Sequence, residues 1–267
     1  MPAIIAEWES VRKPVIGMLH LLPLPGSPRY GGDLPGVADR MLRDAEALAE
    51  GGVDGLMLEN FGDAPFYPRR VPAGVVAHMA ALAAQVRERF KLPLGINVLR
   101  NDGRSALAVA HASGASFIRV NVLCGARITD QGLIEGIACE LLRERANLRA
   151  EHIRILADIN VKHSPPLGPA RPLEDEIGDL ISRGGADAIV VSGGQTGQPA
   201  DLDELRQAKA AAGHAPVWLG SGVTADNIES YLDHADGFIV GTGLKQDGIA
   251  SNPVDPQRVA ALLARLK

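Results

Sequence analysis

Short runs of apolar, mostly β-branched residues alternate with alanine-rich stretches of helical periodicity along the whole chain. This alternation predicts a parallel α/β fold. We expect eight strands, at Pro14–Leu21, Asp54–Asn60, Leu92–Leu99, Phe117–Leu123, Arg154–Lys162, Ala188–Ser192, Pro216–Ser221 and Gly237–Thr242. Their starts run from residue 14 to residue 237, so seven steps of about 32 residues suit right-handed crossovers through one helix each. Eight such units close into a barrel, and residues 1–267 are predicted to form a single (β/α)8 TIM-barrel domain.

The connections differ at the two ends of the predicted strands. Turns that lead into a strand are short and marked by glycine, whereas three turns that leave a strand are long: 22–36, 61–73 and 163–171. Barrels of this kind build their sites from the turns after the strands. Four aromatic residues lie in two of these long turns: Tyr30, Phe61, Phe66 and Tyr67. They either line a pocket or serve ordinary loop packing.

Side chains alternate across a strand, so each predicted strand has one face toward the helices and one toward the barrel axis. In strand 154–162 the apolar residues occupy one face, which leaves four residues pointing inward: Leu156, Asp158, Asn160 and Lys162. The same reasoning turns five more polar residues inward: His20, Glu59, Asn97, Arg119 and Asn121. Barrel interiors are normally filled by Val, Ile and Leu. Because an unpaired buried ion costs several kcal/mol, these groups either form an internal ion-pair network or line a cavity that binds a ligand.

The inward residues suggest roles in acid–base chemistry. Glu59 or Asp158 would act as acid or base, and His20 as a proton relay or electrophile, unless it is a hydrogen-bonded core histidine. Lys162 would be a cation that stabilises an anionic intermediate, or a Schiff-base nucleophile. Two amides would orient hydroxyl groups: Asn97 and Asn121. A divalent metal could bind His20, Glu59 and Asp158, but no tight ligand spacing supports one, and no cofactor is expected.

The last three predicted strands end in glycine-rich segments instead: Ser192-Gly193-Gly194, Gly220-Ser221-Gly222-Val223-Thr224 and Gly241-Thr242-Gly243. Glycine lets backbone N–H groups approach an oxyanion closely, and Thr224 could cap the following helix. These segments therefore predict a phosphate site; glycines that serve only tight turns are the alternative. The segment from Gly220 also fits the dinucleotide fingerprint, but that motif follows the first strand of its fold, whereas six predicted strands precede this segment.

Seven separated segments also match a known pattern in order: Gly17–Pro28, Glu59–Phe66, Asn97–Asp102, Arg119–Val122, Val161–His163, Gly220–Thr224 and Val240–Lys245. They resemble motifs of the BtpA family, over a span from about Pro14 to Gly248. The resemblance implies a barrel of the ribulose-phosphate-binding group. The family takes its name from a role in photosystem I biogenesis, and the resemblance assigns no reaction or catalytic residue.

Composition narrows the classes of partner. Apolar residues make up 46% of the chain and charged residues 22%, as in a globular core. The net charge of −5 gives no basic excess for nucleic-acid binding. Cys124 and Cys139 are too few for a disulfide framework, and residues 1–13 lack the apolar stretch of a secretory signal. We expect a cytoplasmic protein without a nucleic-acid or integral-membrane partner; self-association into a homo-oligomer stays open.

Two functions of different class fit these observations. In the first, the barrel is an enzyme that acts on a small phosphorylated metabolite, as a sugar-phosphate isomerase or lyase. In the second, the barrel is a non-catalytic assembly factor that serves as a docking body for another protein. A cavity beside the phosphate-binding loops favours the enzyme, whereas an interior filled by side chains favours docking.

Overall fold

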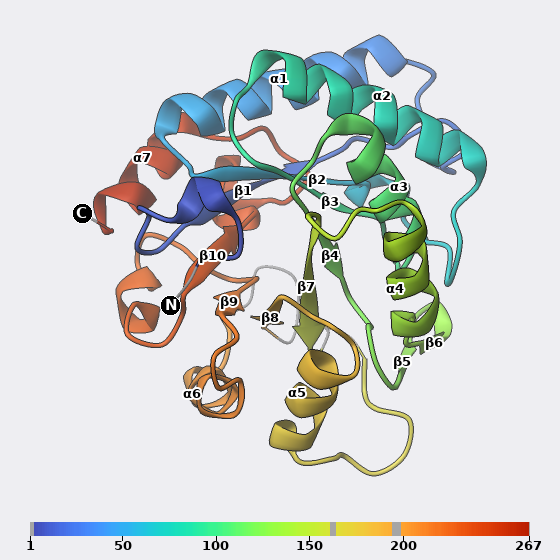
Figure 1. Cartoon of the computed structure of the whole chain (residues 1–267). Helices are drawn as coiled ribbons and strands as arrows, with labels where there is room; N and C mark the ends of the chain where they lie inside the picture. The colour runs from blue at the N-terminus through green and yellow to red at the C-terminus, as the bar shows by residue number, and fades with distance from the viewer. Residues whose placement is uncertain (1–2, 161–163, 194–198, 267) are drawn as a thin grey trace.

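The computed structural model, which describes residues 3–160, 164–193 and 199–266, contains a closed barrel of eight parallel strands with helices around it (Figure 1). The barrel strands are β1 (Val15–His20), β2 (Gly55–Glu59), β3 (Leu94–Asn97), β4 (Phe117–Val120), β7 (Arg154–Ile159), β8 (Ala188–Val191), β9 (Val217–Leu219) and β10 (Gly237–Val240). They follow one another around the barrel in chain order, and β1 pairs with both β2 and β10. Each lies within its predicted bounds, so the predicted TIM-barrel fold is confirmed.

Helices cover the outside of the barrel. They are α1 (Leu34–Gly51), α2 (Ala73–Arg89), α3 (Gly103–Ser113), α4 (Ala138–Asn147), α5 (Leu173–Ser182), α6 (Leu202–Ala211) and α7 (Pro256–Ala264). The sequence sets the ends of α1 clearly: the Asp33 side chain accepts a hydrogen bond from the Gly36 N–H, and Gly52 ends the helix at φ 90°. The connection from β9 to β10 holds the short 3-10 helix η3 (Ile228–Tyr231) in place of an α-helix.

A two-stranded hairpin interrupts the alternation of strands and helices. Strands β5 (Ala126–Thr129) and β6 (Gly132–Glu135) pair antiparallel between β4 and α4. The sequence analysis did not predict this element. The hairpin lies beside α4, where β4 leaves the barrel (Figure 1), so it belongs to the end of the barrel on which the candidate residues lie.

The inner layer of the barrel is apolar toward the amino ends of the strands. It contains Ile16, Met18, Met57, Phe117, Leu156, Ala188, Val190, Trp218 and Ile239. Trp8, in the 3-10 helix η1 (Ala6–Trp8), packs beneath this layer, with its ring centroid 5.5 Å from Phe117 and 5.1 Å from Trp218. The barrel interior is therefore polar only toward the carboxyl ends of the strands, where ligands reach a TIM barrel.

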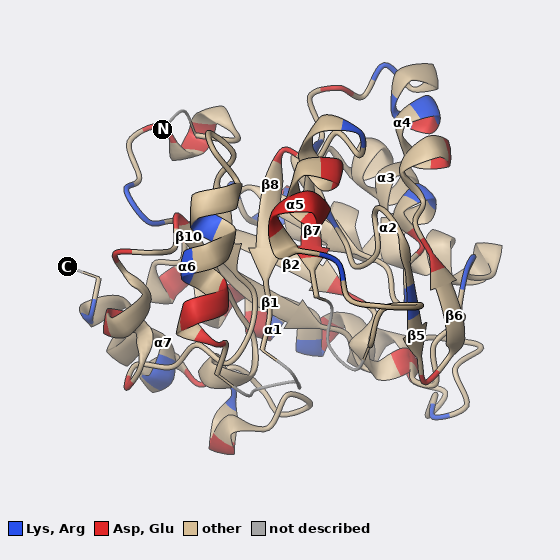
Figure 2. Cartoon of the chain, turned by 90° about the horizontal axis from the view of Figure 1, so that it is seen from below, with Lys and Arg blue, Asp and Glu red and all other residues tan. Residues whose placement is uncertain are grey.

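The outer surface carries charge of both signs. Acidic and basic residues are interspersed over the helices, with acidic residues gathered on α5 (Figure 2). Within the described ranges, no helix is both long and apolar enough to span a bilayer.

Candidate functional site

A cavity of about 260 Å³ opens at the carboxyl ends of the barrel strands. Ten of the residues predicted from the sequence line it: His20, Glu59, Asn121, Asp158, Gly220, Ser221, Gly222, Gly241, Thr242 and Gly243. Four others are not part of its lining: Asn97, Ser192, Gly193 and Thr224. Lys162 and Gly194 lie outside the described residues, and their predicted roles stay predictions. The cavity therefore brings together the acid–base candidates and two of the three glycine segments.

His20 and Glu59 form one wall of this cavity. The two residues are register partners at the ends of β1 and β2, and the His20 Nε2 atom lies 3.7 Å from Glu59 Oε1. His20 Nδ1 lies 3.1 Å from the carbonyl oxygen of Ala250. Since a carbonyl only accepts, Nδ1 carries a proton, and Nε2 is the nitrogen that gains or loses a proton beside Glu59. Phe61 stacks on the imidazole at a centroid distance of 4.5 Å.

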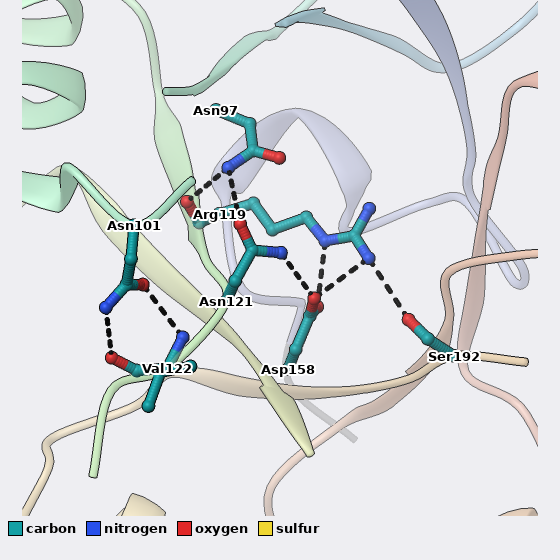
Figure 3. Close-up of polar contacts among 7 residues, drawn as sticks. All are labelled: Asn97, Asn101, Arg119, Asn121, Val122, Asp158 and Ser192. Atoms are coloured by element: carbon teal, nitrogen blue, oxygen red, sulfur yellow. Dashed lines mark hydrogen bonds and ion pairs between the residues drawn. The ribbon is translucent and has the colours of Figure 1, made fainter. Parts of the chain in front are cut away.

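Arg119 and Asp158, which both line the cavity, pair with each other (Figure 3). Arg119 Nε and Nη2 donate to the two carboxylate oxygens of Asp158, at 2.8 and 3.1 Å, and Asn121 Nδ2 donates to the same carboxylate at 2.7 Å. Burial opposes the charge of Arg119, but the charge and hydrogen bonds of Asp158, with Glu59 beyond it, raise the pKa of the guanidinium. The Asp158 side chain is 0% exposed. Three donated hydrogen bonds thus fix the position of this carboxylate.

Two further predicted residues, Ser192 and Asn97, make hydrogen bonds to Arg119. Ser192 Oγ accepts a hydrogen bond of 3.1 Å from Arg119, so its hydroxyl is tied to the ion pair. Asn97 Nδ2 donates to the Arg119 carbonyl oxygen at 3.1 Å, and its Oδ1 is buried without a hydrogen-bond partner among the described residues. Asn101 binds the backbone of Val122 through both amide atoms (Figure 3). Asn97 and Ser192 therefore orient the residues that line the cavity.

The glycine segments after β9 and β10 form the adjoining wall, where a Cβ atom at Gly241 would lie 3.1 Å from His20 Nε2. Within the described residues, six backbone N–H groups of these segments donate no hydrogen bond: those of Ser221, Gly222, Val223, Gly241, Thr242 and Gly243. All six residues line the cavity. A Cβ atom at Gly220 would lie 2.4 Å from Val190 and 3.1 Å from Arg119 Nη2, so only glycine fits beside the ion pair. Backbone N–H groups that face a cavity in this way suit an anion.

Two details of the predicted site are wrong. Thr224 does not cap a helix: its N–H donates to Asn227 Oδ1 at 2.8 Å, and only the four-residue η3 follows. Asn160 does not point into the barrel: β7 ends before it, its φ is 49°, and its side chain is exposed. The side chain bonds Arg127 and Glu204 outside the barrel. The alternation of inward and outward faces ends where the extended backbone ends.

The cavity also contains residues that the sequence analysis did not select. Arg100 and Leu99 follow β3, and Asp130 lies at the tip of the β5–β6 hairpin. Arg100 could have been selected from its place in the turn after β3, since such turns build barrel sites. For Asp130 no signal was available, because the hairpin itself was not predicted. No group of three or more metal-ligating side chains occurs in the ranges that the structure describes.

Comparison with known proteins assigns the family. The sequence profile of the BtpA family matches residues 11–267. The chain belongs to the BtpA family. Among BtpA-family relatives, the photosystem I biogenesis protein BtpA of Synechocystis is 50% identical over 94% of this chain and 86% of its own. An uncharacterised protein of Thermococcus kodakarensis is 49% identical over 96% of both chains.

Solved structures show the same fold at low sequence identity. Phosphoribosyl anthranilate isomerase from Thermus thermophilus superposes with a TM-score of 0.58, over 95% of this chain and 98% of its own, at 14% identity. This likeness supports the barrel fold of the BtpA-family chain.

Proposed function

We propose that this BtpA-family barrel is an enzyme that acts on a small phosphorylated metabolite, as an isomerase or lyase of sugar phosphates. One observation carries the proposal: the cavity of about 260 Å³ has the His20–Glu59 pair beside six backbone N–H groups that donate no hydrogen bond to any described residue. A reacting end thus lies beside an anchoring end. The interior holds a cavity and is not filled by side chains, which favours an enzyme over a docking body.

The anchoring end would hold the phosphate. Ser221, Gly222, Thr242 and Gly243 offer backbone N–H groups, and the hydroxyls of Ser221 and Thr242 belong to the same two segments. An anion held by fixed N–H donors costs little reorganisation during the reaction. Because β9 and β10 are neighbours in the barrel, both segments would bind one phosphate group.

The reacting end would move a proton. Glu59 would take a proton from a substrate carbon next to a carbonyl group, and the carbonyl oxygen would gain a proton from Nε2 of protonated His20. Glu59 would then return its proton to the former carbonyl carbon, while Nε2 of His20 takes a proton from the hydroxyl on the carbon first deprotonated, which completes an isomerisation and restores both groups. Arg119 and Asp158 would hold Asn121 in place to orient a hydroxyl group. Lys162 keeps its predicted role as a cation near the developing negative charge.

A thermal-shift screen over phosphorylated metabolites tests this function. A ligand present at about 100 times its dissociation constant adds roughly 2.7 kcal/mol to the free energy of unfolding. We expect stabilisation by at least one sugar phosphate and none by its dephosphorylated form. Turnover of that compound by the wild type, and its loss in Glu59→Ala and Lys162→Ala with the fold intact, would support catalysis. The proposal fails if no phosphorylated compound stabilises the chain, or if both variants retain full activity.

The second candidate is a non-catalytic assembly factor. It is favoured by the printed name of the Synechocystis relative, which describes a photosystem I biogenesis protein. Such a factor would bind a protein partner through the barrel surface, and substitutions in the cavity would leave its action unchanged. The free thiols of Cys124 and Cys139 support a reducing compartment such as the cytoplasm under either function.

A further inference from the structure

A second hollow adjoins the cavity on the side away from the glycine segments. This side lobe has a volume of about 290 Å³ and lies between the turn after β1, the turn after β2 and the start of α2. Its lining contains Pro25, Ser27, Pro28, Asn60, Asp63, Pro65, Phe66, Tyr67, Val71, Pro72, Gly74, Val75 and Leu99. Phe66 and Leu99 line both the side lobe and the cavity.

The side lobe presents mainly apolar surface although three of its residues are polar by type: Ser27, Asn60 and Asp63. Asp63 accepts hydrogen bonds from the Leu24 N–H at 2.8 Å and from Asn60 Nδ2 at 3.1 Å. Asn60 Oδ1 in turn accepts from the Leu99 N–H at 2.8 Å. The side chains of Asp63 and Asn60 therefore make their hydrogen bonds within the turns, which they hold together. The rest of the lining is mainly proline, aromatic and aliphatic side chains, which suit an apolar or aromatic group.

Ser27, the third polar residue, does not present its hydroxyl to the lobe. Its Oγ atom is covered by protein and makes no hydrogen bond within the described residues.

The order of the strands places the proposed reacting groups between the glycine segments and the side lobe. Around the barrel, β9, β10, β1, β2 and β3 are consecutive neighbours. The glycine segments follow β9 and β10, His20 and Glu59 end β1 and β2, and the lobe is lined from the turns after β1, β2 and β3. A ligand that reaches from one end to the other thus passes His20 and Glu59.

The cavity and the lobe are of similar size, about 260 and 290 Å³. Because Phe66 and Leu99 line both, one ligand can occupy the two together. We infer that the ligand of this site is a phosphorylated compound that also carries an aromatic group, which lies in the side lobe against Phe66 and Tyr67. This inference rests on the proposed function and names the class of its substrate.

Matched pairs of phosphate esters test the inference without assuming the sugar. Calorimetry would compare ω-phenylalkyl phosphates, with linkers of two to six methylene groups, with the n-alkyl phosphates of the same linkers. At one linker length we expect the phenyl compound to bind about ten- to hundredfold more tightly than its n-alkyl counterpart. This is the gain expected when an aromatic ring of this size is transferred from water to an apolar site. If phosphate esters bind but no linker length shows a gain, the inference is wrong and the proposed function stands. If no phosphate ester binds, both are wrong.

Gly74→Phe shows whether the gain comes from the side lobe. Gly74 lines the lobe near the start of α2, and a Cβ atom there meets nothing within 4 Å, so phenylalanine can fill the space without a clash. Gly178→Phe, at an equally open position in α5, is the matched control. We expect Gly74→Phe to abolish the gain and leave n-alkyl phosphate binding unchanged, and Gly178→Phe to change neither. A gain that survives Gly74→Phe would overturn the inference.

Tyr67→Ala is a second variant that does not depend on tolerance at Gly74. The Tyr67 side chain is 48% exposed, so its removal leaves the barrel core intact. We expect the gain from the phenyl group to fall several-fold while n-alkyl phosphate binding is unchanged. An undiminished gain in this variant would also contradict a ring bound against Tyr67.

Discussion

Gly243 lies so close to Val223 that a Cβ atom at position 243 would be 2.2 Å from the Val223 carbonyl oxygen. The contact is between two backbones, so no side chain can rotate away to relieve a substitution. It joins the segment after β9 to the segment after β10, which are the two halves of the proposed phosphate site.

The first prediction follows from this contact. Gly243→Ala would push the two segments apart, and we expect the affinity for inorganic phosphate or a phosphate ester to fall at least tenfold in calorimetry. Gly178→Ala is the control, since its Cβ meets nothing within 4 Å; a helical glycine replaced by alanine gains about 0.5–1 kcal/mol of stability. Unchanged phosphate affinity in Gly243→Ala would contradict the assignment of this site.

The second prediction concerns the reacting end. Glu59→Gln keeps the shape of the side chain but removes the base, so we expect kcat on the compound found by the thermal-shift screen to fall about 10²–10⁴-fold. Phosphate affinity should not fall, because a carboxylate base donates no hydrogen bond to a phosphate. Glu229→Gln, which replaces an exposed partner of Arg265, should leave kcat unchanged. Full activity of Glu59→Gln would exclude Glu59 as the acid or base.

The third prediction concerns stability. Arg119→Met leaves the Asp158 carboxylate buried without its cation, which costs about 3–5 kcal/mol of unfolding free energy. The double variant Arg119→Met, Asp158→Leu removes both charges and should recover most of that loss, because an ion pair replaced by apolar side chains of similar volume is often neutral. Urea unfolding measures both. Equal losses in the two variants would show that the charge pairing is not what stabilises this part of the barrel.

The fourth prediction is a pH dependence at Glu204. Burial raises the pKa of this carboxyl above its ordinary value of 4.5, although the hydrogen bond from Asn160 opposes the shift. The folded state thus holds its proton more tightly than the unfolded state, so this residue's contribution is most favourable below pH 4.5 and is lost as the pH rises through the raised pKa. Glu204→Gln still accepts from Asn160 and should be more stable than the wild type at pH 7. Denaturation at several pH values should show this advantage vanish below about pH 4.

Much of the fold and part of the site followed from periodicity. The alternation along β2, β4 and β7 predicted that Glu59, Arg119 and Asp158 point inward, and all three line the cavity. Periodicity could not predict which of these side chains pair. Arg119 pairs with Asp158, and Glu59 lies beside His20, because of distances across the barrel that the sequence does not give. It also failed where the backbone departs from a strand, as at Asn160, whose φ is positive.

The loops were the least predictable part. The short 126–135 segment forms a hairpin because its ends pair across a tight turn, yet no Asn-Gly or Asp-Gly marks that turn in the sequence. The sequence predicts that Thr224 caps a helix, but the connection to β10 contains only the short 3-10 helix η3. Of the aromatic residues expected either to line a pocket or to pack the long turns, Phe61 and Phe66 line the cavity, and Phe66 and Tyr67 line the side lobe. That these pockets are two adjoining hollows could not be predicted, because the lobe is formed by turns that are distant in sequence.

The Trp8–Trp218 contact has a consequence for how the chain acquires its structure during synthesis. Residues 210 positions apart meet at the closed end of the barrel, and β1 finds its second neighbour only in β10. A chain emerging from the ribosome therefore cannot complete its inner layer until residue 240 or so has been translated. Until then Trp8, Ile16 and Met57 stay open to water or to chaperones, as expected for topologies in which long-range contacts form last.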